Sequence, residues 1–184
     1  SWAGRNAEAL ASHARAMELA EELLAENPDD PDRRHDLARF RGDYAWTLIW
    51  SEGIREGARI LDEVEPELSA LARDFPQRLD FQLSLWEYCR YAGDAHRYQG
   101  DIPASRVVLG RGLEHLYALR DRFPDHPRVL KSLRLSLIGV GELQEEPAPE
   151  LAYASYAEGL AIAERQLRVD PEDREARRGY ASLL

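Results

Sequence analysis

Apolar residues recur at helical spacing along most of this chain. Between residues 3 and 26 they include Leu10, Met17, Leu19, Leu23 and Leu24. This spacing is typical of an amphipathic helix, because one turn takes 3.6 residues. Similar stretches predict further helices near residues 31–51, 54–74, 79–100, 103–122, 126–145 and 149–168. The pattern predicts an all-α fold of about seven helices.

Four X-Pro pairs mark a repeat. They are Asn27-Pro28, Phe75-Pro76, Phe123-Pro124 and Asp170-Pro171, so successive prolines lie 48, 48 and 47 residues apart. A large side chain follows nine residues after each proline, at Leu37, Leu85, Leu133 and Tyr180. A small residue follows seventeen residues after the first three, at Ala45, Gly93 and Gly141. This agreement predicts an internal repeat with two helices in each copy.

The repeat predicts one domain over residues 1–184. Three repeats span about 28–75, 76–123 and 124–170, with a helix at 3–26 before them and an incomplete repeat at 171–184. Pro66 predicts a kink or split near Val64 in the helix at 54–74. Because one helix pair cannot bury its own apolar face, we expect antiparallel hairpins stacked in an α-solenoid. A compact bundle of the same helices is the alternative.

The small residues of the repeats resemble those of the tetratricopeptide repeat family, in a long-helix version with a period of 47–48 residues. On the first helices they are Tyr44-Ala45, Ala92-Gly93 and Val140-Gly141. On the second helices they are Ser105, Gly112, Ala152 and Gly159, with Gly57 and then Val64 in the first repeat. The segment 156–164 also resembles arrays attached to bacterial signalling proteins such as protein kinases and caspase-like proteases. The resemblance implies stacked hairpins and protein–protein interaction.

Composition and charge limit the ligands, the cellular compartment and the source expected for this protein. The net charge is −10, and the arginines are interleaved with acidic residues, which argues against a nucleic-acid-binding face. Cys89 is the one cysteine, so an intramolecular disulfide is excluded and a reducing cytoplasm is expected. No apolar run approaches the length that spans a membrane. Lys131 is the one lysine, which suggests a GC-rich bacterial genome. The unusual start and the helical pattern at the end suggest part of a larger protein.

No residue pattern in the chain predicts catalysis, a cofactor or a metal. The five histidines lack metal-ligand spacing, although His96 and His115 fall on opposite helices of one hairpin. Cys89 has no predicted base beside it and is expected to be a buried small side chain. Gly110-Arg111-Gly112 lies within a helix and lacks the strand–turn–helix context of a dinucleotide site. We therefore expect a protein that is not an enzyme.

A cluster of aromatic residues and arginines is the candidate binding site. In the tetratricopeptide repeat family, the first helices line the concave groove. Placing Ala45 and Gly93 at helix crossings then turns one set of residues toward that groove: Arg39, Asp43, Trp46, Trp50, Arg90, Tyr91, Asp94, Arg97 and Tyr98, with Glu142 in the third repeat. Aromatic residues and arginine are enriched at binding hot spots. The alternative is that aromatics fill the core, which we favour for Trp46, Trp86 and Tyr88.

Three functions follow from this sequence. The first is a scaffold or regulatory module that binds a peptide, a protein, or another domain of the same polypeptide. In it, Arg39, Arg90 and Arg97 would pair with carboxylates, and Trp50, Tyr91 and Tyr98 would supply apolar contact. The second is a self-association module acting through the terminal helices. The third is a ligand-sensing helical domain.

Overall fold

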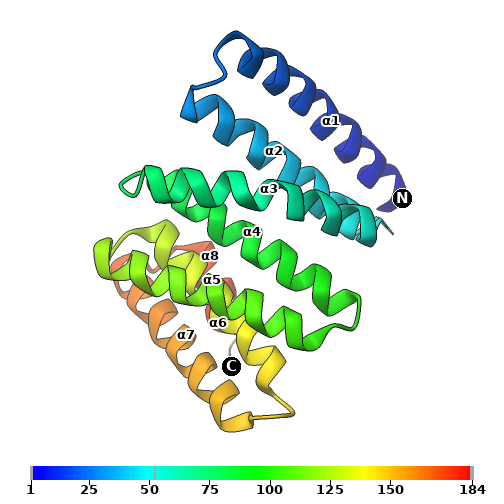
Figure 1. The fold of residues 1–184 in the computed structure, drawn as a ribbon. Coiled ribbons are helices and arrows are strands. Elements are labelled where there is room, and N and C mark those ends of the chain that lie inside the picture. Colours follow the sequence, from blue (N-terminus) through cyan, green and yellow to red (C-terminus); the bar gives the residue numbers. More distant parts are fainter. Residues whose placement is uncertain (1, 52, 183–184) are drawn as a thin grey trace. The chain divides into compact units, whose positions relative to one another are not determined.

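The computed structural model describes residues 2–51 and 53–182, with the side chains of residues 6–51 and 53–181. The described residues form eight helices and no strand, which confirms the all-α fold (Figure 1). The helices are α1 (Trp2–Glu26), α2 (Pro31–Ile49), α3 (Ile54–Asp74), α4 (Leu79–Tyr98), α5 (Ile102–Arg122), α6 (Pro127–Gln144), α7 (Pro149–Val169) and α8 (Arg174–Ser182). Helix α8 adds one to the seven expected, and it begins the predicted incomplete repeat.

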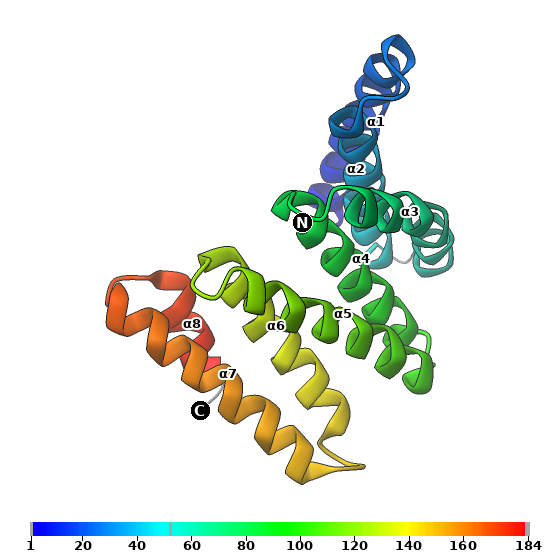
Figure 2. The same ribbon diagram turned by 60° about the vertical axis from the view of Figure 1, so that its left-hand side comes forward.

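The helices fall into two compact units, the N-terminal unit Ser1–Asp101 and the C-terminal unit Ile102–Leu184. In the N-terminal unit each helix packs on the next, and α2 also contacts α4 (Figure 1). In the C-terminal unit each helix likewise packs on the next, and α6 also contacts α8 (Figure 2). Contacts between alternate helices place the first helices of successive hairpins side by side, as stacked hairpins require. That the whole chain is a single domain stays a prediction.

The helix ends follow local chemistry. Asp30 caps α2 by accepting hydrogen bonds from the backbone N–H groups of Asp32 and Arg33, at 2.9 and 3.4 Å. Pro31 follows in the first turn, where a missing N–H costs nothing. Helix α3, by contrast, runs unbroken through Pro66, so a split near Val64 is wrong, and the kink stays a prediction. Buried Val64 and Leu68 flank the proline and hold both halves of the helix against the core.

The small residues expected at helix crossings are buried. They are Ala45, Gly93 and Gly141 on first helices and Gly57, Ser105, Gly112, Ala152 and Gly159 on second helices. Gly57 shows why size matters there: a β-carbon on it would lie 2.7 Å from the carbonyl oxygen of Ala45. Ordinary van der Waals contacts are longer than 3.4 Å. The pairing of α2 with α3 therefore depends on a missing side chain.

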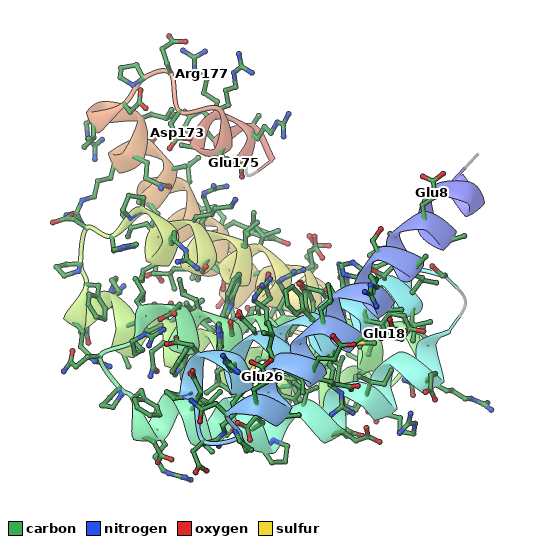
Figure 3. The ribbon with its side chains drawn as sticks, turned by 90° about the horizontal axis from the view of Figure 1, so that it is seen from above. Glu8, Glu18, Glu26, Asp173, Glu175 and Arg177 are labelled. Atoms are coloured by element: carbon green, nitrogen blue, oxygen red, sulfur yellow. The ribbon has the colours of Figure 1, made fainter. Side chains whose placement is uncertain are left out.

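Helix α1 is covered on one side by α2. It carries Glu8, Glu18 and Glu26 along its length (Figure 3), while Ala20 is buried. Leu19 and Leu23, one turn apart, remain 43% and 49% exposed. This helix therefore keeps two large apolar side chains at the surface.

A buried polar pair joins α2 to α4. His35 Nε2 and Ser84 Oγ are hydrogen-bonded at 2.8 Å, and the imidazole lies 4.6 Å from the ring of Phe81. Burial lowers the pKa of His35, against the opposing effect of nearby Asp80 and Asp36. The neutral imidazole is thus the form that the fold favours.

This histidine predicts a loss of stability in mild acid. Because the unfolded chain takes up a proton near pH 6.5 and folded His35 does so only at lower pH, the free energy of unfolding should fall as pH drops through 6.5. Replacing His35 with glutamine keeps a hydrogen-bonding group for Ser84 and should reduce that fall. Urea midpoints at pH 7.5 and 5.5 measure the fall in the free energy of unfolding. The control is His13→Gln on α1, which should leave this fall unchanged. Equal pH dependence in wild type and His35→Gln would contradict the prediction.

Candidate partner-binding surface

The eight predicted binding residues lie on two contacting helices of the N-terminal unit. Helix α2 carries Arg39 and Asp43 and ends at its C-cap, Trp50. Helix α4 carries the remaining five residues, Arg90, Tyr91, Asp94, Arg97 and Tyr98. We call these eight residues together with Trp46 the aromatic–arginine surface. Glu142, expected to extend the groove, lies on α6 in the other unit.

Four aromatic rings of this surface form a continuous row. Trp46 stacks on Tyr91, with ring centroids 4.6 Å apart and planes at 15°. Trp46 also meets Trp50 edge-on at 5.4 Å, and Trp50 meets Tyr98 edge-on at 5.1 Å. Both geometries are favourable for aromatic pairs. The row runs from the interior of the helix pair to its surface.

Two contacts join residues 48 positions apart, the period of the repeat. The Tyr91 hydroxyl donates a hydrogen bond to Asp43 Oδ1 at 3.2 Å, and Trp50 contacts Tyr98. Equivalent positions on α2 and α4 therefore meet directly. The surface therefore contains pairs of residues that occupy the same position in successive repeats.

Exposure divides the aromatics into two groups. Trp50 is 55% exposed and Tyr98 42%. Tyr91 differs from the groove expectation, since stacking on Trp46 leaves it only 7% exposed. Trp86 and Tyr88 are buried, as expected for core residues, and Trp46 is half-buried. Trp50 and Tyr98 are thus the exposed rings of the surface, and they contact each other and Trp46, which stacks on Tyr91.

The arginines of the surface lie over its rings and beside acids. The guanidinium carbon of Arg90 is 4.5 Å from the Tyr91 centroid and 4.9 Å from that of Trp46. Its ion pair with Glu87 measures 3.6 Å, longer than a hydrogen bond, and its buried Nε has no hydrogen-bond partner among the described residues. Arg97 lies over Tyr98 at 5.3 Å.

The remaining ion pairs balance the charge of the surface. Arg97 pairs with Asp94 at 3.1 Å. Arg39 lies 3.6 Å from Asp43 and 3.7 Å from Asp36. The surface is therefore aromatic and close to neutral, because each guanidinium has a carboxylate on its own helix.

Tyr91 is a supporting residue of this surface. Burial, together with the carboxylates of Glu87 and Asp43, raises the pKa of its phenol well above the usual value. The hydroxyl therefore stays protonated and remains a donor to Asp43. This bond fixes the ring on which Trp46 stacks.

Sequence reasoning gave Trp46 both places, in the groove and in the core, and favoured the core; the half-buried ring links Trp50 to Tyr91. It missed Glu87, which pairs with Arg90 of the surface. The sequence spacing of Trp46 and of Glu87 indicates their contacts. Trp46 and Trp50 are four residues apart on one helix, and Glu87 and Arg90 are three apart, spacings that place side chains together.

The described space beside the surface is small. A space beside Gly42, Asp43 and Tyr91 has a volume of about 10 Å³, close to the minimum for one water molecule. Within the part of the chain that the structure describes, no group of three or more His, Cys, Asp or Glu residues is placed to hold a metal ion. Cys89 is buried, as expected.

None of the described helices combines the length and the apolar character needed to cross a membrane. Comparisons of the chain with models of protein families, with curated proteins and with solved structures gave no match.

Proposed function

We propose that this chain is a non-catalytic interaction module that binds a peptide or protein partner on the aromatic–arginine surface. The observation that carries the proposal is the contacting pair Trp50 and Tyr98, which stays about half exposed beside Arg97. Tryptophan, tyrosine and arginine are the residues that dominate binding energy at interfaces. Their backing by Trp46 and Tyr91 holds the rings in place before a partner arrives, which reduces the entropy lost on binding.

The setting of this module is part of the proposal. The 47–48-residue period and the buried small residues support a long-helix relative of the tetratricopeptide repeat family. The resemblance of segment 156–164 to arrays of bacterial signalling proteins supports a place within a larger protein of that kind. The single buried cysteine supports a reducing compartment such as the cytoplasm.

Peptides selected from a random display library on the wild-type chain would test the surface. Replacing Trp50 and Tyr98 together with alanine should weaken the selected peptides at least tenfold, about 1.4 kcal/mol, because the exposed apolar contact is lost. Fluorescence polarisation with labelled peptides measures the affinity. The matched control replaces Leu151 and Tyr153, two exposed residues of α7, with alanine and should leave the affinity unchanged. Equal losses in both double variants would contradict the proposal.

Self-association is the second candidate function, favoured by exposed Leu19 and Leu23 on α1. Light scattering after size-exclusion chromatography separates the two functions. If the wild-type chain is a dimer and the double variant Leu19→Lys, Leu23→Lys is a monomer, the dimer forms through α1. If the Trp50→Ala, Tyr98→Ala variant instead turned a dimer into a monomer, the aromatic–arginine surface would be the self-association interface, and partner binding there would be wrong.

A further inference from the structure

The exposed end of the aromatic–arginine surface carries two donor groups that the protein does not use internally. They are the indole N–H of Trp50 and the phenol O–H of Tyr98, and neither has a hydrogen-bond partner among the described residues. The hydroxyls of Tyr91, Tyr117 and Tyr156, by contrast, each donate to a carboxylate of the protein, at 3.2, 2.7 and 2.7 Å. Water satisfies the two exposed donors in the free protein, so a partner that replaces this water has to supply acceptors.

The charges around the two exposed rings favour an uncharged partner. Arg97 pairs with Asp94 at 3.1 Å, and the surface as a whole is close to neutral. Trp50 caps the C-terminal end of α2 and Tyr98 ends α4, and the C-terminal end of a helix carries partial negative charge. An acidic segment would meet these helix ends, whereas a basic segment would meet Arg90 and Arg97. Charge complementarity therefore points to a segment without charged side chains.

The rings offer inclined faces for contact. The plane of Trp50 lies at 69° to that of Tyr98 and at 84° to that of Trp46. At the other end of the row, the space beside Asp43 and Tyr91 has a volume of only about 10 Å³, too small for a side chain to enter. The described residues form helices and no strand, so they offer no sheet edge to an extended peptide. A partner must therefore pack flat groups onto the rings.

We propose that the partner segment is rich in proline and lies across Trp50 and Tyr98 in the polyproline II conformation. This inference rests on the proposed function, whose surface it uses. Proline has no backbone N–H, and polyproline II forms no internal hydrogen bonds, so its carbonyl oxygens are free to accept from Trp50 Nε1 and from the Tyr98 hydroxyl. Its pyrrolidine rings are uncharged and apolar, and grooves lined by aromatic rings are the usual sites for such segments.

The exposed rings match about one turn of such a segment. A polyproline II turn takes three residues and about 9 Å. The ring centroids of Trp50 and Tyr98 are 5.1 Å apart, so one turn covers both rings. The segment is already ordered before it binds, and it therefore loses little conformational entropy on a surface of this small size.

Fluorescence polarisation of the wild-type chain with labelled decaproline tests the partner class. The control peptide repeats Gly-Ser to the same length and carries the same label, so it is also uncharged but has no rings and no fixed conformation. Decaproline is expected to bind at least tenfold more tightly than the Gly-Ser peptide. Equal affinity for the two peptides would show that neither the rings nor the conformation is recognised, and the inference would be wrong.

The peptides selected from the random library separate this inference from the proposed function. Enrichment of proline among them is the expected result. If acidic or basic residues are enriched instead, while the Trp50→Ala, Tyr98→Ala variant still loses affinity for these peptides, the interaction module stands and the proline-rich partner is wrong. Decaproline that binds this double variant as tightly as the wild type occupies another place on the chain, which also overturns the inference.

Two conservative variants test the hydrogen bonds. Tyr98→Phe keeps the ring and removes the donor, so decaproline should bind about threefold to tenfold more weakly, the range of one hydrogen bond. Trp50→Phe removes the indole donor and should also weaken binding. Tyr153→Phe removes an exposed hydroxyl of α7 and is the matched control, which should bind like the wild type. Wild-type affinity in both Tyr98→Phe and Trp50→Phe would show that the donors play no part, contrary to the proposal.

Discussion

Replacing Phe81 with alanine is expected to lower the free energy of unfolding of the N-terminal unit by about 3–5 kcal/mol. The ring is fully buried at the start of α4. It lies 4.6 Å from the imidazole of His35 on α2 and 5.7 Å from the ring of Phe75, which caps α3. One side chain thus ties three helices together, and its removal leaves a cavity that all three would have to close.

Urea denaturation followed by tryptophan fluorescence measures this loss. All four tryptophans lie within residues 1–101, so the signal reports on the N-terminal unit. Phe75→Ala serves as the control, because the ring of Phe75 is already 36% exposed and its removal should cost less than half as much. A loss below about 1 kcal/mol for Phe81→Ala would show that the helices can collapse into the space, contrary to the close packing of cores.

The hairpin architecture could be predicted from sequence because its signals are local. Pro31, Pro127 and Pro149 each stand in the first turn of a helix, as their fixed backbone angle favours. The small residues seventeen positions after the first three repeat prolines are buried, because a stacked hairpin needs close backbone contact at one place in each copy. Pro66 does not split α3 as one alternative expected, because buried Val64 and Leu68 hold the helix against the core on both sides of it.

The details of the surface depended on packing that a single sequence does not specify. Tyr91 and Tyr98 lie seven residues, about two helical turns, apart on α4, yet one is buried under Trp46 and the other is exposed. Arg134 is a second case, a nearly fully buried arginine that donates a hydrogen bond to the backbone oxygen of Glu175 at 3.1 Å. A charged residue in a helical pattern predicts a solvated face. Here α8 covers the side chain, and that follows from tertiary structure alone.

Replacing Gly57 with alanine is expected to lower the free energy of unfolding of the N-terminal unit by about 2 kcal/mol, within the usual range for overpacking. Alanine forms helices better than glycine by about 1 kcal/mol, so helix propensity alone predicts the opposite sign. The added β-carbon would lie 2.7 Å from the carbonyl oxygen of Ala45 and 2.7 Å from Cγ1 of Ile49. A backbone oxygen cannot rotate away, so α2 and α3 would have to separate.

Gly42→Ala on α2 is the matched control, because a β-carbon there would meet nothing within 4 Å. It should raise the free energy of unfolding by up to about 1 kcal/mol, and the same fluorescence signal reports both variants. The two substitutions are therefore expected to act in opposite directions. Stabilisation by both would mean that the α2–α3 crossing is looser than the structure has it. Because α2 also carries Trp46 and Trp50, a displaced α2 in Gly57→Ala should weaken the selected peptides as well, whereas Gly42→Ala should bind them like the wild type.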